Sequence, residues 1–234
     1  MTQVSSLYVT DPALGATGLP QNILLRTGRQ RQAFEQGCNR GATLKALQDY
    51  ALAAIGLFLA LPIFLVIALA IKLDSRGPVL FRQRRHGRDH RIITVLKFRT
   101  MNVCEDGDKV TQARRGDKRI TRIGWLLRRS SLDELPQLIN VLRGEMSIAG
   151  PRPHALAHNA YYGSLIENYG ARHQVKPGIT GWAQVHGFRG ETSSLELMAS
   201  RVRYDLEYVE NRFAWLDLKI IFMTPLFALF SNAR

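Results

Sequence analysis

The longest apolar stretch of the chain runs from Tyr50 to Ile71 and contains no charged residue in 22 positions. At about 1.5 Å per residue, a straight helix of this length would cover roughly 33 Å, which is enough to cross a bilayer. A buried helix of a soluble protein is the alternative, but uncharged runs of this length are uncommon in soluble cores. The stretch therefore predicts contact with a membrane.

Two features of this stretch argue against a simple crossing. Pro62 lies at its middle, where it removes a backbone donor and clashes with the carbonyl of Phe58, which bends or breaks a helix. Arginine and lysine also flank the stretch on both sides, and positive charge prefers the cytoplasmic side. We therefore predict a re-entrant membrane helix pair over residues 43–76, broken at Pro62. A kinked spanning helix remains the alternative, because membrane helices tolerate proline.

The pattern after this stretch predicts a mixed α/β domain, mostly helical, over residues 77–234. Two β-type stretches, about Val79 to Arg84 and Arg91 to Phe98, enclose a polar turn and predict a hairpin. A basic amphipathic helix is predicted by apolar residues at helical spacing among arginines, namely Ile120, Ile123, Leu126 and Leu127. The stretch from Trp215 to Phe230 predicts a helix in the membrane interface, with a core helix as a nearly equal alternative. Residues 1–42 show no sustained period and are expected to form a polar, flexible extension.

Charge narrows the choice of partners. The sequence has 32 lysines and arginines against 19 acids, and the excess is concentrated between Arg76 and Arg129. Such a balance predicts an anionic partner: nucleic acid, acidic lipid or a phosphorylated substrate. The neighbouring apolar stretch favours lipid over nucleic acid. Cys38 and Cys104 have no metal-type spacing, so we expect a reducing compartment and neither a disulfide framework nor a zinc site.

The acidic pair Asp133 and Glu134 has two interpretations. Ser131 and Glu134 fit a capping box, in which Glu134 reaches back to the helix start and Asp133 is a first-turn acid. Pro136 fits that helix start poorly. Spacing alone favours the cap, and chemistry at the two carboxylates is the alternative.

Several basic residues and stiff loops are candidates for binding anions. Lys97 and Arg99 are two positions apart, so a strand would present both on one face, as suits a diphosphate, although a solvated basic face is the alternative. The sequence "GPRP", residues 150–153, would present Arg152 from a rigid loop. Residues 175–192 are glycine-rich without a helical period and predict a structured loop. His154 and His158 have no evident further ligands, so surface histidines are expected.

At these motifs the sequence resembles the bacterial sugar transferase family, the monotopic polyprenyl-phosphate hexose-1-phosphate transferases. The similarity covers about Thr43 to Phe230 through "KFRTM" (97–101), "SLDELPQLINVLRGEMS" (131–147), "GPRP" (150–153), "KPGITGWAQV" (176–185) and "WLDLKI" (215–220). The loop from Trp182 to Val209 looks most like the undecaprenyl-phosphate glucose phosphotransferase branch. The turn before strand 91–98 has His90 where the family frequently has glycine. A multi-helix membrane domain found ahead of the catalytic one in some relatives has no counterpart here, so the minimal catalytic form is expected.

The resemblance implies an enzyme on the cytoplasmic face of the bacterial inner membrane. It would transfer a hexose 1-phosphate from a UDP-sugar to undecaprenyl phosphate, releasing UMP, in the first membrane step of exopolysaccharide assembly. UDP-glucose is favoured over UDP-galactose, no nucleic acid partner is expected, and the oligomeric state is left open. A basic membrane protein without enzymatic activity is the competing class.

The resemblance also implies roles for individual residues. Asp133 would attack phosphorus to form an aspartyl phosphosugar, and Glu134 would hold Mg²⁺. The matching phosphate-binding or nucleotide-binding positions are Lys97, Arg99, Arg128, Pro151, Arg152, Pro153 and Arg189. Asp205 is a weaker candidate for the site.

Overall fold

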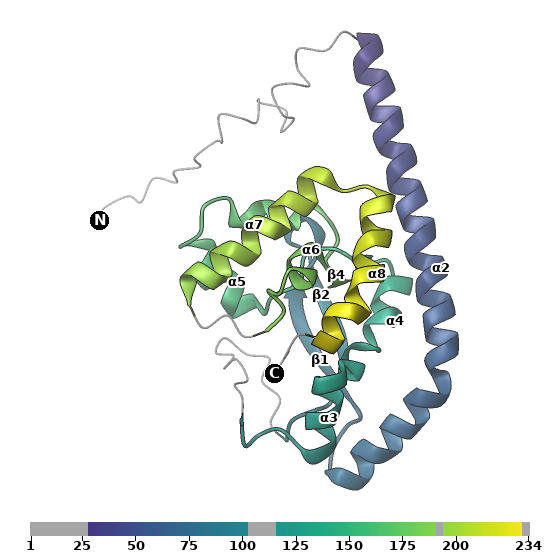
Figure 1. Ribbon diagram of the computed structural model, residues 1–234, viewed down its shortest axis with the longest axis vertical. Coiled ribbons are helices and arrows are strands. Elements are labelled where there is room, and N and C mark those ends of the chain that lie inside the picture. Colours follow the sequence, from purple (N-terminus) through teal and green to yellow (C-terminus); the bar gives the residue numbers. More distant parts are fainter. Residues whose placement is uncertain (1–27, 103–115, 191–193, 231–234) are drawn as a thin grey trace, which may run out of the picture. The chain divides into compact units, whose positions relative to one another are not determined.

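The computed structural model describes residues 28–102, 116–190 and 194–230 (Figure 1). The chain divides into two compact units, 1–44 and 45–234. Most of the predicted extension, residues 1–27 of 1–42, lies outside the described residues, and from Gly28 onward the chain is helical. The second unit contains the elements that build the candidate site, and its mixed α/β, mostly helical composition matches the prediction.

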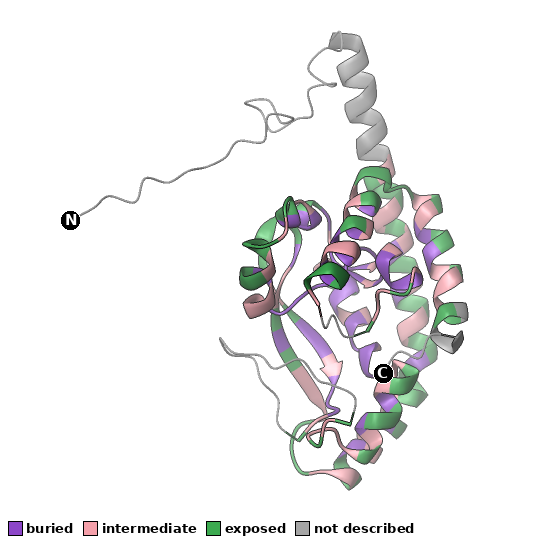
Figure 2. Cartoon of the chain, turned by 60° about the vertical axis from the view of Figure 1, so that its left-hand side comes forward, coloured by how far each residue is buried: buried purple, intermediate pink, exposed green. Residues whose placement is uncertain are grey.

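Helix α2 (Gly28–Asp74) carries the long apolar stretch. Ala53, Ala60 and Ile67 recur every seven residues and are buried, whereas Phe58 and Leu65 are 72% and 74% exposed. Buried, intermediate and exposed positions alternate along this helix (Figure 2). Within the described residues, α2 is the one helix long and apolar enough to cross a membrane, and only 17% of its most apolar window is buried. A soluble core helix would be mostly covered, so the exposed apolar face indicates membrane association.

The predicted pair of helices broken at Pro62 is not observed. The α2 helix continues through Pro62 to Asp74, and its ribbon curves toward the C-terminal end (Figure 1). Proline removes one backbone hydrogen bond and crowds the preceding turn, which a helix can accommodate by bending. The structure therefore has a single curved helix where two were predicted.

The predicted hairpin is confirmed. Strands β1 (Leu80–His86) and β2 (Ile92–Phe98) pair antiparallel, with Leu80 opposite Phe98 and His86 opposite Ile92. The short 3-10 turn η1 (Arg88–His90) joins them. Asp89 and His90 have φ of 54° and 58°, in the left-handed region that glycine adopts more readily.

The basic amphipathic helix is also confirmed, as α3 (Arg122–Ser130). Thr121 caps its start by accepting a hydrogen bond from the Gly124 amide. Leu127 is buried against α2 residues, while Trp125 is exposed. The 3-10 turn η2 (Leu132–Glu134) and the short helix α4 (Gln137–Leu142) follow directly.

The rest of the domain is built around a short parallel pair, β3 (Ser147–Ala149) and β4 (Gly178–Thr180). Gly178 is required there, because a Cβ on it would lie 2.1 Å from the Gly150 amide nitrogen. The other elements are α5 (Leu156–Gly163), η3 (Tyr169–Gln174), α6 (Trp182–Val185), α7 (Leu195–Asn211) and α8 (Ala214–Phe230). The prediction of a loop over 175–192 was incomplete, because β4 and α6 lie in it and Val185 belongs to the core.

Helix α8 combines the two predicted alternatives. Ile220 is fully buried in a core with Ala149, Val185 and Tyr208, whereas Trp215 and Phe222 are more than 70% exposed. One side of the helix therefore packs in the core, and the other presents aromatic side chains.

A buried polar network joins α2 to β3, α7 and α8. Lys45 Nζ lies 2.5 Å from Asp217 Oδ2 and donates to Ser147 Oγ at 2.8 Å. The Tyr208 hydroxyl lies 2.6 Å from Asp217 Oδ1 and 2.9 Å from the Ala149 carbonyl oxygen. These contacts fix the α2 turn around Lys45 to β3, α7 and α8.

Candidate active site

Asp133 and Glu134 lie in η2, between α3 and α4, and each is only 8% exposed. Ser131 directs the chain into this turn, because its φ of 60° ends α3. Its side chain makes no capping bond, and its hydroxyl accepts a hydrogen bond from Arg189 instead. The capping-box interpretation was therefore wrong: Glu134 does not reach back to the start of a helix.

Glu134 is held by two cations. Its Oε1 accepts hydrogen bonds from Lys97 Nζ at 2.8 Å and from Arg152 Nη2 at 2.5 Å, and its Oε2 accepts from Arg152 Nη1 at 3.2 Å. Burial alone would raise the pKa of Glu134, but the charges and hydrogen bonds of Arg152 and Lys97 hold that pKa well below its usual range. Glu134 is consequently an ionised, fixed anion.

Asp133 differs from its neighbour. Among the described residues its carboxylate has no hydrogen-bond partner, although the charges of Lys97, Arg128 and Arg152 act on it. Burial raises the pKa of Asp133, with Lys97 opposing and Glu134 reinforcing the change. Adjacent carboxyl groups whose pKa values are pushed apart have distinct chemical roles. Among the described residues, Glu134 is therefore the carboxylate held by hydrogen bonds, and Asp133 is the one without them.

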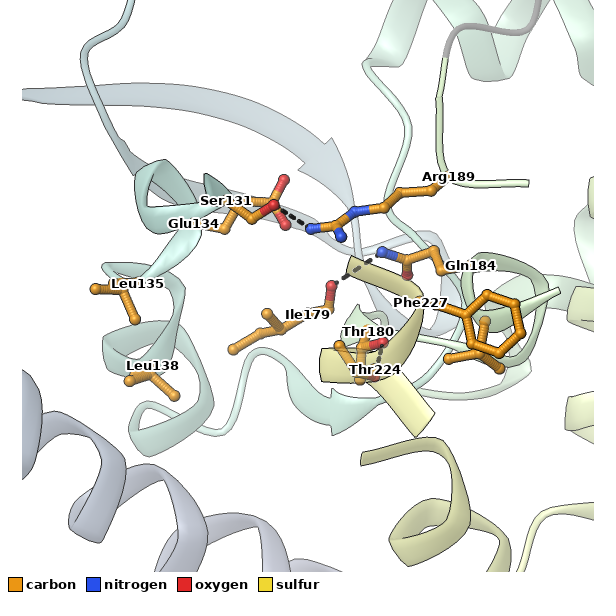
Figure 3. Close-up of a pocket in the computed structure, with 11 residues that line it drawn as sticks. Ser131, Glu134, Leu135, Leu138, Ile179, Thr180, Gln184, Arg189, Thr224 and Phe227 are labelled. Carbon is orange, nitrogen blue, oxygen red and sulfur yellow. Dashed lines mark hydrogen bonds between the residues drawn. The ribbon is translucent and has the colours of Figure 1, made fainter. Parts of the chain in front are cut away.

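A pocket of about 190 Å³ lies beside the carboxylate pair (Figure 3). Glu134, Ser131 and Arg189 form one end, where the Arg189 guanidinium points toward the Ser131 hydroxyl. Leu135, directly after η2, and Leu138, on α4, line the other end (Figure 3). The remaining lining comes from β4, α6 and α8, through Ile179, Thr180, Gln184, Val185, Thr224 and Phe227. The pocket is therefore polar near the carboxylates and apolar away from them.

The structure brings most of the predicted basic residues to the carboxylate pair. Lys97 reaches it from β2 and Arg152 from the loop after β3, with Pro151 and Pro153 buried on either side. Arg189 reaches it through Ser131. Arg128, at the end of α3, lies near enough for its charge to favour ionisation of Asp133. These groups give the site an excess of positive charge suited to a diphosphate.

Arg99 is placed elsewhere. Its guanidinium donates to the carbonyl oxygens of Ser75 and Arg76, which closes the connection between α2 and β1. Strand β2 ends at Phe98, so the alternation that predicted a face shared with Lys97 stops one residue before Arg99. Arg99 therefore positions the chain and does not meet the carboxylates.

Asp205 is linked to the carboxylate pair indirectly, through Arg172 and the backbone of Arg152. Its Oδ2 accepts from Arg172 Nη2 at 2.7 Å, and both side chains are almost fully buried. Arg172 Nη2 also donates to the backbone carbonyl of Arg152 at 2.6 Å. This pair supports the loop that presents Arg152. No motif or spacing in the sequence singled out Arg172.

His154 is buried, contrary to the expectation of a surface histidine. Its Nδ1 lies 2.7 Å from the Tyr169 hydroxyl and 2.6 Å from Arg172 Nη1. His158 is half-buried on α5 and makes a ring contact with Tyr162. Neither histidine meets the carboxylate pair.

The oxygen ligands near the pocket fit a magnesium ion. Mg²⁺ prefers carboxylate, phosphate and water oxygens and takes few ligands from the protein itself. An ionised carboxylate offers about four acceptor positions, and Glu134 uses three of them. The Asp133 carboxylate adds unengaged oxygens beside it. These donors suit Mg²⁺ completed by water and substrate oxygens.

Comparison with known proteins places this geometry in context. The family model described as "Bacterial sugar transferase" matches residues 40–231. The UDP-glucose:undecaprenyl-phosphate glucose-1-phosphate transferase of Escherichia coli (strain K12) is 57% identical over 188 residues, which are 80% of this chain and 40% of that protein. A Caulobacter vibrioides protein of the same name is 52% identical over 180 residues, 77% of this chain and 67% of that protein.

A shorter relative is matched over most of its length. The exopolysaccharide production protein PSS of Rhizobium leguminosarum bv. phaseoli is 46% identical over 186 residues, 77% of this chain and 92% of that protein. By contrast, the chain spans about 40% of the length of the Escherichia coli, Klebsiella pneumoniae and Xanthomonas campestris relatives that it matches.

Proposed function

Since the chain belongs to the bacterial sugar transferase family, we propose that it transfers glucose 1-phosphate from UDP-glucose to undecaprenyl phosphate and releases UMP. The observation that carries the proposal is the buried carboxylate pair, in which Glu134 is held by Lys97 and Arg152 while Asp133 has no hydrogen-bond partner among the described residues. The names of the Escherichia coli and Caulobacter vibrioides relatives support the choice of sugar and acceptor. The name of the Rhizobium relative supports a role in exopolysaccharide production.

Asp133 acts as the nucleophile in this proposal. One carboxylate oxygen attacks the phosphorus that bears the glucose, and the bond from that phosphorus to the bridging oxygen breaks. UMP leaves with the electron pair, and glucose 1-phosphate remains on Asp133 as a mixed anhydride. A phosphate oxygen of undecaprenyl phosphate then attacks the same phosphorus and releases the Asp133 carboxylate. Each half of the reaction forms one oxygen–phosphorus bond and breaks one.

The basic residues make attack on an anionic diphosphate feasible. A carboxylate approaching a diphosphate is opposed by charge repulsion, which fixed cations around the site offset. Lys97 and Arg152 contact Glu134 directly, and Arg189 lines the pocket beside them. The Asp205–Arg172 pair holds the backbone of Arg152 in place. These residues bind and orient the diphosphate, and Asp133 supplies the reacting atom.

We also assign Mg²⁺ binding to Glu134. The ion, when bound, would neutralise charge on the diphosphate and on departing UMP. The low pKa of Glu134 keeps its side chain ionised, which oxygen coordination requires.

The membrane would hold this enzyme through α2, on the cytoplasmic face of the inner membrane. The exposed apolar face of α2 and the basic residues on both flanks support this placement. We propose that α2 enters and leaves the bilayer on the same side, bent near Pro62, with a kinked spanning helix as the alternative. The exposed aromatic side of α8 would lie in the interface.

Cysteine labelling tests the topology. With Cys38 and Cys104 replaced by serine, single cysteines at Leu47→Cys and Arg76→Cys flank the apolar stretch on exposed positions. Both should react with an impermeant maleimide from the cytoplasmic side only. Reaction of the two positions from opposite sides would establish a spanning helix.

A direct assay tests the reaction. Purified protein in detergent is incubated with Mg²⁺, radiolabelled UDP-glucose and undecaprenyl phosphate, and UMP release is measured. Without the acceptor, labelled glucose should remain on the wild-type chain and be absent from the Asp133→Asn variant. Failure to release UMP from any of a panel of UDP-sugars would favour a basic membrane-binding protein without enzymatic activity.

Two further outcomes separate parts of the proposal. Asp133→Asn should lose more than a hundredfold in rate, because loss of a covalent nucleophile costs several kcal/mol of barrier and a hundredfold corresponds to about 2.7 kcal/mol. A kcat/KM for UDP-galactose equal to or above that for UDP-glucose would overturn the sugar and leave the phosphotransfer mechanism intact.

A further inference from the structure

Three histidines that are distant in the sequence meet at the tip of the β1–β2 hairpin. His86 ends β1, His90 ends η1, and His173 lies in η3. One possible ligand atom from each of the three lies within 4.8 Å of the other two. The ring centroids are 5.7 Å apart for His86 and His90, 5.6 Å for His86 and His173, and 4.5 Å for His90 and His173. We refer to these residues as the histidine cluster.

The backbone places His90 in the cluster at a conformational cost. Both Asp89 and His90 are in the left-handed region, which is unfavourable for a residue with a Cβ. The ring of His90 lies over Gly170, where an added Cβ would be 3.8 Å from the His90 Nε2. A turn that only joined two strands could use glycine at these positions without this cost. Packing alone therefore does not explain why the backbone adopts an unfavourable conformation at the point where the three histidine rings meet.

Burial favours the neutral forms of His86 and His173, and the neutral imidazole is the form that binds a metal. Burial lowers the pKa of His173 to about 3, and the charge of Arg172 and the two neighbouring histidines act in the same direction. Burial and His90 also lower the pKa of His86. Neutral imidazoles carry a ring lone pair each, which is the form that binds divalent ions.

Groups around the cluster orient its rings. The side-chain amide nitrogen of Asn159 lies 2.8 Å from the His86 Nδ1, and His173 forms a hydrogen bond with the backbone of Gly87. The Asn159 amide can present either its nitrogen or its oxygen to His86, since Tyr169 on its other side can donate or accept. When the amide is rotated by 180° from its orientation in the structure, its oxygen faces His86, so that Nδ1 carries the proton and Nε2 is free to bind a metal. Such partners are typical of histidines that ligate metals.

We propose that His86, His90 and His173 bind a divalent transition-metal ion of the zinc class, with water as a fourth ligand. Zinc binds imidazole nitrogen at about 2.0–2.1 Å in a tetrahedral arrangement, so ligand nitrogens lie about 3.3 Å apart and the rings must approach by at most about 1.5 Å. His90 is exposed at the hairpin tip and can make that movement and admit the ion. Magnesium does not suit three nitrogens, which distinguishes this site from the oxygen ligands at Glu134.

The bound ion would fasten the hairpin to η3. His86 and His90 belong to the hairpin whose second strand carries Lys97, and His173 follows Arg172, which bonds the backbone of Arg152. The positive charge of Arg172 is offset by Asp205 at 2.7 Å, so it does not stand alone against a cation. The ion would therefore stabilise the two segments that present both cations of the carboxylate pair, without contacting the pocket.

Zinc titration of the full chain tests the site independently of catalysis. The protein is purified without a polyhistidine tag, with Cys38 and Cys104 replaced by serine, stripped with EDTA and titrated with ZnCl₂ in detergent. We expect one equivalent to bind per chain, with a rise in melting temperature. Cobalt(II) in place of zinc should give the absorption bands of a tetrahedral site.

His90→Gly is the decisive variant, because glycine suits the left-handed backbone and removes one ligand. It should melt at or above the metal-free wild-type temperature and bind zinc more than about tenfold more weakly, since even loss of an outer partner typically costs 10–100-fold. The matched control His158→Ala changes a half-buried histidine outside the cluster and should keep the zinc response. The variants Asp133→Asn and Glu134→Gln should also keep it. Absence of saturable zinc binding in the wild type, or unchanged binding in His90→Gly, would overturn the proposal.

Discussion

The structure predicts that the two adjacent carboxylates make opposite contributions to stability. Glu134→Gln keeps the shape of the side chain but removes the charge that three hydrogen bonds from Lys97 and Arg152 satisfy. Both cations would then remain partly buried, with side chains 16% and 21% exposed, without their anion. Removing one member of a buried pair costs about 3–5 kcal/mol, and the residual exposure places this case near 3 kcal/mol.

The same substitution at the neighbouring position should have a different effect. Asp133 has no hydrogen-bond partner among the described residues, and burial disfavours its ionised form. Asp133→Asn should therefore leave the free energy of unfolding unchanged or raise it slightly, although the proposed mechanism predicts that both variants lose activity. A 150–250-residue domain shifts by about 2–4 °C per kcal/mol, so Glu134→Gln should melt about 6–12 °C below the wild type.

The comparison is made by thermal unfolding of both variants in the same detergent, at neutral pH and without Mg²⁺. Circular dichroism before heating serves as the control for correct folding. A Glu134→Gln variant within 2–4 °C of the wild type would match the roughly 1 kcal/mol of a lost cap and refute the two-cation clamp. A loss as large in Asp133→Asn would refute the distinction between the two carboxylates.

Three further predictions follow from the pKa shifts and the buried network. In the proposed mechanism the ionised form of Asp133 reacts, and burial raises its pKa, so kcat/KM should fall on the acid side at a pH above the ordinary aspartate value of about 3.9. An acid limb at or below that value would contradict the assignment. Asp205→Asn leaves Arg172 buried without its anion and should lower stability by about 3 kcal/mol, which unchanged thermal unfolding would disprove. Tyr208→Phe removes the hydroxyl that contacts Asp217 and should lower the free energy of unfolding by about 1–3 kcal/mol, while kcat per folded molecule stays the same. A selective loss of kcat would argue against a purely structural network.

Elements with a regular period could be predicted from the sequence. Two β-type stretches around a polar turn located the hairpin, helical spacing located α3, and the long uncharged run located the apolar part of α2. Strand β4 and helix α6 have three and four residues, which is too short for any period to emerge, so their stretch resembled a loop. Their positions depend on pairing with β3, which is a contact between distant parts of the chain.

The candidate site was predictable as a set of motifs but not as a geometry. The spacing of Ser131 and Glu134 fits a capping box, and only the left-handed φ of Ser131 shows why no such cap forms. Arg99 was predicted beside Lys97 because the alternation of a strand was extended one residue past the predicted end at Phe98, where β2 does end. Arg172 and the histidine cluster involve residues from separate elements, so no local spacing could bring them together.

The exposed apolar face of α2 has a consequence for how the proposed reaction is measured. Enzyme and lipid acceptor would share one two-dimensional phase, in which encounters depend on lateral diffusion. The rate should then follow the mole fraction of undecaprenyl phosphate in the bilayer and not its amount per volume of buffer. Adding acceptor-free phospholipid to the same proteoliposomes by fusion should slow turnover by surface dilution, even though every bulk concentration of substrate stays the same.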